Sequence, residues 1–394
     1  MKRFDAIVIG GGVIGSSIAF HLARLGLPSV ALIERAQIGN GTSAQSSGIL
    51  RTHYSVPENV VLARDSWRIF SDFAAYLDDP DASCGLVRCG YLIVAPEGER
   101  AAALNDALAA QRGLGIRADV IDATQARSLL PLADFADAAL IGFEPEAGFA
   151  DAYLVSTAFA RSARRLGATL IEGCTVTGLL HAGQRVSGVR TSSGDLAAGI
   201  VVSAQNIWSS ELAGWTGLDL PLQRERHTVL SLECAARYSN AMPVFKDLAS
   251  AGMLYYRSYG GAQMLVSEGT AGEAMQGIDT DPGEVSLDTV LAIGEQVALR
   301  FPDYASAGLA ASWTGVYDVT PDWNPVLGPA PGWDGLFLAY GFSGHGFKLS
   351  PMIGRLVAQT ALGLPTDVAL APYALERFRA GRLLRGRYGL GAVS

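Results

Sequence analysis

The sequence predicts a fold that is α/β in its first domain and α+β overall. A Rossmann-like domain carries a discontinuous second domain built on an antiparallel sheet. Three observations predict this fold. A buried strand, a glycine turn and an amphipathic helix follow one another within residues 4–25; alternating apolar strands occupy residues 176–203; and a second strand, glycine loop and helix unit occupies residues 336–362.

Length and composition favour a two-domain globular protein. The chain has 394 residues, 49% of them hydrophobic, and a net charge of -8. This charge disfavours a nucleic-acid partner, because phosphate binding needs clustered Lys and Arg, so we expect a small-molecule partner. The four cysteines show no metal-ligand spacing, which predicts no metal site and a reduced, cytoplasmic protein. No apolar run approaches the ~20 residues of a transmembrane segment.

The N-terminal turn has the spacing of a dinucleotide-binding motif. Gly10 permits a tight turn after the first strand, Gly12 lets the backbone approach a pyrophosphate, and Gly15 allows the helix to pack closely on the strand. Val13 and Ile14 begin the helix, whose N-terminus would face the phosphate charge.

An acidic residue follows the next strand at the expected distance. Residues 30–33 predict a second buried strand, and Glu34 comes 19 residues after Gly15. A carboxylate at this position accepts hydrogen bonds from a ribose 2'-hydroxyl and repels a 2'-phosphate. The motif therefore indicates FAD or NAD, not NADP.

Three separated segments resemble one flavoenzyme superfamily. They are the small-residue loop 41–51 (GTSAQSSGILR), the run 320–325 (TPDWNP) and the loop 341–348 (GFSGHGFK). In this order they resemble the D-amino acid oxidase and sarcosine oxidase superfamily, in particular its sarcosine oxidase branch, from about residue 5 to about residue 362. The resemblance implies that the dinucleotide is FAD.

The resemblance also implies a set of cofactor-binding residues. They are Gly10, Gly12, Val13, Ile14, Gly15, Glu34, Arg35, Thr42, Ser43, Ser47, Gly48, Leu50, Val176, Ala204, Gly315, Gly344, His345, Gly346, Phe347 and Lys348. Backbone N–H groups at residues 344–347 would face the flavin edge where negative charge gathers on reduction. One departure is the run 204–208 (AQNIW), where relatives carry a glycine soon after the strand.

Two further departures predict noncovalent FAD. Gly315 stands where monomeric sarcosine oxidases have a cysteine, and Gln45 stands where dimethylglycine dehydrogenases have a histidine. A third departure concerns the electron acceptor, which is either oxygen or another carrier. Leu265 aligns with a lysine of monomeric sarcosine oxidases, and its lack of charge favours a carrier other than oxygen.

The same resemblance implies the substrate-binding residues. Arg51 and Lys348 would bind a substrate carboxylate above the flavin ring, with Tyr317 near by. The segment 252–269 would form the roof of the site, and from it we select Tyr256 as the fourth catalytic candidate. The alternatives are a structural salt bridge for Arg51, a surface position for Lys348, and ordinary core positions for the two tyrosines. His53 and His227 are weaker candidates, since neither belongs to a matched motif.

The expected function is FAD-dependent oxidation of a small amino acid at a CH–NH group. Resemblance favours a secondary or N-alkylated substrate like sarcosine, dimethylglycine, proline or glycine. Oxidation of a 2-hydroxy acid is an alternative, as is a flavoprotein subunit of a heteromeric amino acid dehydrogenase; a homo-oligomer is also compatible. The basic tail that contains Arg377 suggests a partner surface, or a solvated tail.

The dense motifs at both ends predict discontinuous domains. We assign residues 1–85, 145–215 and 316–370 to the FAD-binding domain, residues 86–144 and 216–315 to the substrate domain, and residues 371–394 to a C-terminal tail.

Overall fold

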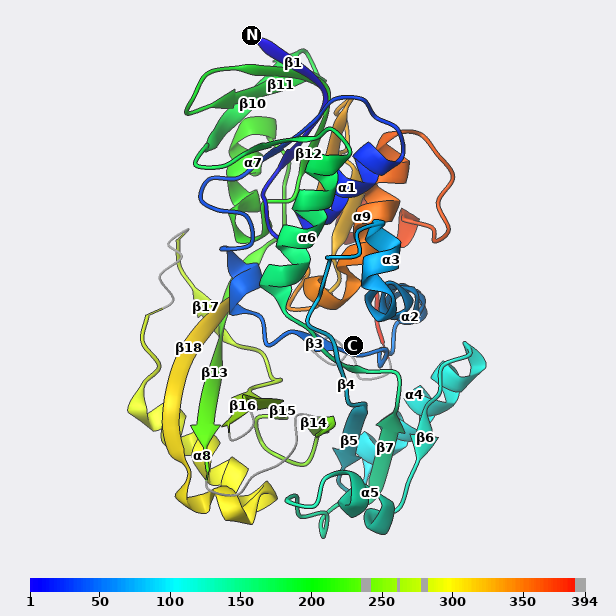
Figure 1. Ribbon diagram of the computed structural model, residues 1–394, viewed down its shortest axis with the longest axis vertical. Coiled ribbons are helices and arrows are strands. Elements are labelled where there is room, and N and C mark those ends of the chain that lie inside the picture. The colour runs from blue at the N-terminus through cyan, green and yellow to red at the C-terminus, as the bar shows by residue number, and fades with distance from the viewer. Residues whose placement is uncertain (235–241, 261–262, 278–282, 387–394) are drawn as a thin grey trace.

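The computed structural model describes residues 1–234, 242–260, 263–277 and 283–386. Two large sheets lie in the two halves of the molecule, the first in the upper half and the second in the lower half of the view (Figure 1). The fold is mixed α/β, as the sequence predicts.

The first sheet contains the N-terminal strand and is mainly parallel around it. Its order is β10-β11-β12-β1-β2-β9, with β20 beside β12 and β19 beside β20. The second half of β1, residues 6–9, is apolar and buried, as expected where both faces of a sheet are covered. The strands are β1 (Lys2–Ile9), β2 (Val30–Ile33), β9 (Thr169–Ile171), β10 (Val176–Ala182), β11 (Arg185–Thr191), β12 (Leu196–Ser203), β19 (Val326–Pro329) and β20 (Leu336–Tyr340).

Helices cover one face of this sheet, and the β10–β11 hairpin and a short helix cover the other (Figure 1). Helix α1 packs between α6 and α9. The approach of α9 depends on Gly354, where a Cβ atom would collide with Ser17 of α1. The helices are α1 (Val13–Arg24), α2 (Pro57–Ser71), α3 (Phe73–Leu77), α6 (Ala152–Arg165) and α9 (Gly346–Ala361) on the first face, and α7 (Ser209–Thr216) on the second.

The second sheet is mainly antiparallel and has a core of its own. Its order is β17-β13-β16-β15-β14-β5-β7-β6, and β18 pairs with β13. Apolar residues of this sheet pack with α5 and α8. The elements are β5 (Tyr91–Ala95), α4 (Glu99–Gly113), β6 (Asp119–Val120), α5 (Ala123–Leu129), β7 (Leu140–Glu144), β13 (Gln223–Glu233), β14 (Val244–Asp247), β15 (Tyr255–Tyr259), β16 (Gln263–Ser267), β17 (Glu273–Met275), α8 (Leu287–Arg300), η3 (Pro302–Ser306) and β18 (Gly308–Val319).

A small sheet lies where the chain passes between the two halves. Strand β8 (Gly148–Phe149) pairs with both β3 (Ile49–Leu50) and β4 (Val87–Arg88). Every strand of the first sheet falls within the segments assigned to the FAD-binding domain. We therefore propose the same discontinuous division, although β18 crosses the expected boundary at residue 316.

The C-terminal segment is not simply a solvated tail. It continues through η4 (Ala371–Tyr373) and α10 (Glu376–Arg379). Arg377 is only 1% exposed and forms an ion pair with Asp322, so its charge serves the interior of the molecule and not a partner surface. Arg387, the last arginine of the basic tail, lies outside the described residues. Within the described part of the chain, none of the helices has the length and apolar character needed to cross a membrane.

Candidate active site

One cavity runs from the N-terminal glycine turn to the second sheet. At its first end, the chain leaves β1 at Gly10, whose φ of 103° favours glycine. A Cβ atom on Gly10 would collide with the carbonyl oxygen of Ala204, and one on Gly15 would collide with the carbonyl oxygen of Gly10. These glycines bring the N-terminus of α1 to the cavity, and its first turn carries no acidic residue. A pyrophosphate fits this electropositive end.

Glu34 lies at the end of β2, beside this turn. Its carboxylate accepts hydrogen bonds from the backbone N–H groups of Gly11 at 2.7 Å and Ala36 at 2.9 Å. The guanidinium of Arg35 lies 4.8 Å from the ring centroid of Trp208. Glu34 and Arg35 both line the cavity, at the distance along the chain that a ribose-binding carboxylate requires.

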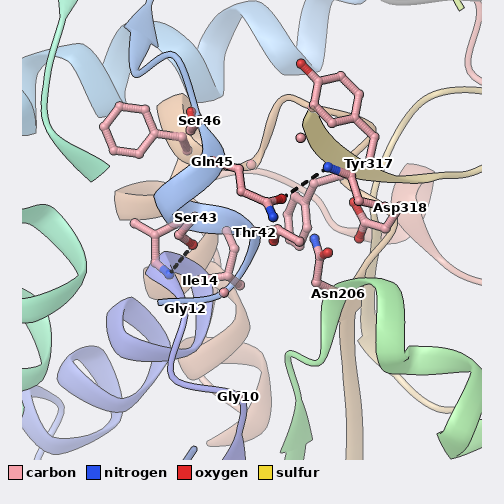
Figure 2. Close-up of a pocket in the computed structure, with 18 of the residues that line it drawn as sticks. Gly10, Gly12, Ile14, Thr42, Ser43, Gln45, Ser46, Asn206, Tyr317 and Asp318 are labelled. Atoms are coloured by element: carbon pink, nitrogen blue, oxygen red, sulfur yellow. Dashed lines mark hydrogen bonds between the residues drawn. The ribbon is translucent and has the colours of Figure 1, made fainter. Parts of the chain in front are cut away.

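The loop 41–51 crosses the middle of the cavity (Figure 2). It contains the short helix η1 (Thr42–Gln45). Ser43 Oγ accepts a hydrogen bond from the Val13 N–H at 3.1 Å, and Gln45 Oε1 accepts one from the Val316 N–H at 3.1 Å. The loop is therefore bonded to α1 on one side and to β18 on the other.

The C-terminal glycine loop, residues 341–346, forms the wall of the cavity on the side of the first sheet. It begins after β20 and leads into α9, whose first turn has no acidic residue. Asp318, which is 1% exposed, accepts a hydrogen bond from the Gly341 N–H at 2.6 Å. Burial raises the pKa of Asp318 to about 6, although backbone hydrogen bonds from the loop act to lower it. A Cβ atom on Gly344 would collide with the ring of Tyr317, so only glycine lets the loop approach β18 so closely.

Arg51 and Lys348 both face the cavity and are 4% and 9% exposed. Arg51 Nη1 has no hydrogen-bond partner among the described residues, and its guanidinium lies 4.4 Å from the ring centroid of Tyr54. Lys348 Nζ donates to the carbonyl oxygen of Gly344 at 3.4 Å. Burial and the charge of Arg51 hold the pKa of Lys348 well below its usual value. Two buried basic side chains thus face the cavity without an ion pair to a carboxylate in the described chain.

Tyr317 lines the same cavity, and a histidine stacks on it. The rings of His227 and Tyr317 lie 3.9 Å apart at an interplanar angle of 23°. His227 is 3% exposed, its ring nitrogens have no hydrogen-bond partner in the described residues, and Nε2 lies 3.7 Å from Glu225 Oε2. The cavity therefore includes a histidine that sequence reasoning rated low.

The structure places Tyr256 away from the cavity, contrary to its selection as a catalytic candidate. Its ring lies in the apolar core, 4.9 Å from the ring centroid of Phe301. Side chains alternate along β15, so the neighbouring Tyr255 points to the opposite face and lines the cavity. Tyr259 is 47% exposed. Residues 261 and 262 of the expected roof segment lie outside the described chain.

Most of the predicted residues meet at this cavity, and we propose that they bind FAD and substrate. Gly15, Gly48 and Leu50 do not line it; Gly15 and Gly48 allow close backbone packing behind it, and Leu50 is buried in the core. The predicted residues that line it are Gly10, Gly12, Val13, Ile14, Glu34, Arg35, Thr42, Ser43, Ser47, Arg51, Val176, Ala204, Gly315, Tyr317, Gly344, His345, Gly346, Phe347 and Lys348.

Sequence reasoning missed several lining residues. Gln205 and Asn206 lie in the stretch that departs from the family pattern, so no motif identified them. Asp318 follows Tyr317 directly, but no sequence motif marks it. Its role becomes visible only in the structure, where it accepts a hydrogen bond from the Gly341 N–H of the glycine loop. The missed lining residues include Asn40, Ser46, Gln205, Asn206, Trp208, Glu268 and Asp318, whereas His227 was a weaker candidate and Tyr255 belongs to the expected roof segment.

Comparison with known proteins agrees with this arrangement. The model of the FAD dependent oxidoreductase family DAO matches residues 5–360. The chain is 28% identical to sarcosine oxidase subunit beta of an Arthrobacter species, over 100% of this chain and 95% of that one. It is also 29% identical to glycine oxidase of Geobacillus kaustophilus, over 95% of this chain and 97% of that one.

Two solved structures share the fold over nearly the whole chain. The crystal structure of L-proline dehydrogenase from P. horikoshii has a TM-score of 0.88 and 25% identity, and covers 97% of this chain and 99% of that one. The crystal structure of glycine oxidase from Geobacillus kaustophilus has a TM-score of 0.83 and 28% identity, and covers 96% and 99%. The chain is an FAD-dependent oxidoreductase that belongs to the DAO family, within the D-amino acid oxidase and sarcosine oxidase superfamily.

Proposed function

We propose that this protein oxidises a small amino acid at its CH–NH group and that Arg51 and Lys348 bind the substrate carboxylate. The observation that carries the proposal is the lack of an ion pair for these two buried cations within the described residues. Two other buried arginines, Arg300 and Arg377, do have carboxylate partners. Arg300 lies 2.9 Å from Asp247, and Arg377 lies 2.8 Å from Asp322. A buried cation needs a counter-charge, and a substrate anion would supply it.

The two cations would orient the substrate as well as bind it. A guanidinium holds a carboxylate in a bidentate geometry, and an ammonium adds a compact charge. With the carboxylate fixed, the carbon that bears the hydride, either the α-carbon or another carbon bonded to the amine nitrogen such as an N-methyl group, has little freedom, which favours reaction. When bound, FAD supplies the chemistry that accepts a hydride from that carbon, and water then hydrolyses the imine product.

The substrate class follows from the relatives. Sarcosine oxidase subunit beta, L-proline dehydrogenase and glycine oxidase are named for small amino acids, two of them with a secondary amine. We therefore propose a secondary or N-alkylated amino acid, such as sarcosine, dimethylglycine or proline. Anaerobic titration of the yellow protein with N-methyl, cyclic and primary amino acids and with 2-hydroxy acids tests this proposal. Bleaching by 2-hydroxy acids alone would contradict it.

The electron acceptor is oxygen or another carrier. Leu265 is 3% exposed and does not line the cavity, although alternation along β16 puts it on the same face as the cavity-lining Ser267. The Nζ atom of Lys246 lies close to Gly269, which lines the cavity. Mixing substrate-reduced protein with aerated buffer in a stopped-flow instrument distinguishes the two acceptors, since an oxidase reoxidises rapidly.

A subunit role is the second candidate. Two relatives named as sarcosine oxidase subunit beta are covered over 95% and 90% of their length. We propose that this chain works either alone or with a partner of that kind. Size-exclusion chromatography of native extract, followed by activity of the isolated chain, separates these cases, because full activity alone excludes an obligatory partner.

A further inference from the structure

A row of polar side chains crosses the second sheet on the face that roofs the cavity. Lys246 on β14 pairs with Tyr255 on β15, and Tyr255 pairs with Ser267 on β16. Side chains directly opposite one another on neighbouring strands share a face of the sheet. Because Tyr255 and Ser267 line the cavity, Lys246 stands on the same face, directly beside them.

Lys246 is fully buried, and its ammonium lies against Tyr255. Its Nζ atom is 3.6 Å from the centroid of the Tyr255 ring, and it donates a hydrogen bond to the carbonyl oxygen of Met253. The position of Nζ requires Gly269, where a Cβ atom would collide with it. Burial lowers the pKa of Lys246 to about 8, the charge of Arg51 lowers it further, and Tyr255 acts to raise it.

The nearest carboxylate along the chain belongs to another ion pair. Asp247 follows Lys246, but its oxygens accept hydrogen bonds from Arg300 at 2.9 and 3.1 Å. Successive side chains of β14 point to opposite faces, so Asp247 lies on the far side of the sheet. On the cavity side, the ammonium of Lys246 lies against Tyr255, whose phenolate can balance its charge.

The other charged and titratable side chains around Tyr255 are consistent with its pairing with Lys246. Arg51 lies near it, as do Tyr91 of β5, Tyr54 and Tyr317. Glu144 of β7 interacts with both Arg51 and Tyr91. Burial alone would raise the pKa of Tyr255, but the charges of Lys246 and Arg51 outweigh it and lower the pKa to about 8. Burial raises the pKa values of Tyr54, Tyr91 and Tyr317.

Building on the proposed function, we propose that Tyr255, paired with Lys246, accepts the proton that the substrate ammonium must lose before oxidation. The N–H bond breaks and leaves its electron pair on nitrogen, while the phenolate oxygen forms the new O–H bond. Arg51 and Lys348 hold the carboxylate, so the ammonium beside it lies in a field of positive charge. Like charges disfavour the ammonium and therefore help the transfer.

Lys246 has a different role from Tyr255. Tyr255 lines the cavity and would contact substrate, whereas Lys246 is 0% exposed and acts on substrate only through Tyr255. Lys246 is thus a positioning residue that keeps Tyr255 ionised. Replacing Lys246 should shift the pH dependence of the rate of flavin reduction, and leave that rate at high pH nearly unchanged.

The first test follows flavin reduction by saturating substrate under anaerobic conditions across pH. In the native protein the limiting rate should rise with pH through a midpoint near the pKa of about 8 for Tyr255. Lys246→Met should move that midpoint upward by at least about one pH unit. Tyr255→Phe should lower the rate by about a hundredfold and remove this limb of the profile. Tyr259→Phe, which alters the exposed tyrosine of the same strand, should match the native protein.

A second measurement does not depend on turnover. Ultraviolet difference absorbance during a pH titration reports tyrosinate formation, and the native protein should show one tyrosine ionising near pH 8. Tyr255→Phe should lose this transition, and Lys246→Met should move it upward. If no amino acid reduces the flavin, the proposed function fails while this titration still tests the pair.

Specific results would overturn the proposal. An unchanged profile in Tyr255→Phe would do so, as would an unshifted midpoint in Lys246→Met. If Lys246→Met does not fold, Lys246→Gln takes its place. His227→Asn tests the competing acceptor, since His227 also lines the cavity. Loss of the limb in that variant, with its retention in Tyr255→Phe, would assign the proton to His227 instead.

Discussion

The guanidinium of Arg377 lies 2.8 Å from the carboxylate of Asp322, in an ion pair whose side chains are 2% and 0% exposed. The same carboxylate accepts a hydrogen bond from the Leu384 N–H at 3.0 Å. Asp322 belongs to the turn between β18 and β19, and Arg377 belongs to α10. The pair therefore holds the C-terminal segment against the chain that leads out of the active site.

Breaking this pair should destabilise the protein strongly. Arg377→Met leaves the Asp322 carboxylate buried without its counter-charge, which costs about 3 to 5 kcal/mol. Urea unfolding monitored by circular dichroism measures the change. Arg355→Gln is the matched control, because Arg355 pairs with Asp367 at the surface, where such pairs contribute at most about 1 kcal/mol. A loss for Arg377→Met as small as that of the control would contradict the expectation.

Arg51→Met should weaken the binding of carboxylate ligands. A hydrogen bond to a charged group contributes about 1.5 to 3 kcal/mol, so we expect Kd to rise by about 10- to 150-fold. Titration with a carboxylate competitor, followed by the change in flavin absorbance, gives Kd directly. Arg68→Gln changes an arginine whose side chain is 69% exposed and should leave Kd unchanged. Equal Kd values in Arg51→Met and the native protein would exclude Arg51 from the carboxylate site.

FAD should be released when the protein is denatured in acid. A cysteine is absent at Gly315 and a histidine is absent at Gln45, so two routes to covalent attachment are missing. After precipitation and centrifugation, the yellow colour should be in the supernatant. Colour that stays with the protein pellet would show a covalent bond.

Gly15→Ala should impair both folding and FAD retention. The new Cβ atom would collide with the carbonyl oxygen of Gly10, and forced overpacking of this kind costs about 1 to 3 kcal/mol. Thermal unfolding and the ratio of flavin to protein after gel filtration measure the two effects. Gly41→Ala is the control, since Gly41 also lines the cavity but a Cβ atom there meets nothing within 4 Å. Equal flavin content in the two variants would contradict this account of the turn.

Protonation of the buried His21 should destabilise the protein in mild acid. Burial lowers its pKa from 6.5 to about 3. Its Nδ1 donates to the Ser17 carbonyl and its Nε2 accepts from the Tyr76 hydroxyl, both at 2.7 Å. Because the folded pKa is the lower one, the contribution is present above pH 6.5 and is lost as pH falls toward 3. The loss should reach about 2 kcal/mol by about pH 5.

The histidine variants separate this contribution from other acid effects. His21→Gln should flatten the decline in unfolding free energy between pH 6.5 and about pH 5. His181→Gln, which alters an exposed histidine, should keep the native decline. Urea unfolding at a series of pH values gives both curves, and parallel curves for the His21 variant and the native protein would refute the assignment.

Local patterns in the sequence predicted the first sheet well. The strands expected at residues 30–33 and 336–340 have the same bounds in the structure, because each is a short apolar run that ends abruptly at polar or glycine residues. The helices expected at residues 12–25 and 347–362 are α1 and α9, whose observed ends lie within one residue of these bounds. Prediction was poorer in the second sheet, where alternation defines two faces of a strand but does not say which one meets the cavity.

The sequence by itself determined the glycine turn, the acidic residue after β2 and the C-terminal glycine loop, and with them the FAD-binding unit, because each depends on neighbours in the chain. The tertiary structure alone decided that Tyr255 rather than Tyr256 faces the cavity, that Lys246 lies beside it, and that Arg377 is buried. These facts depend on strand register and on packing between distant segments, which no local pattern records.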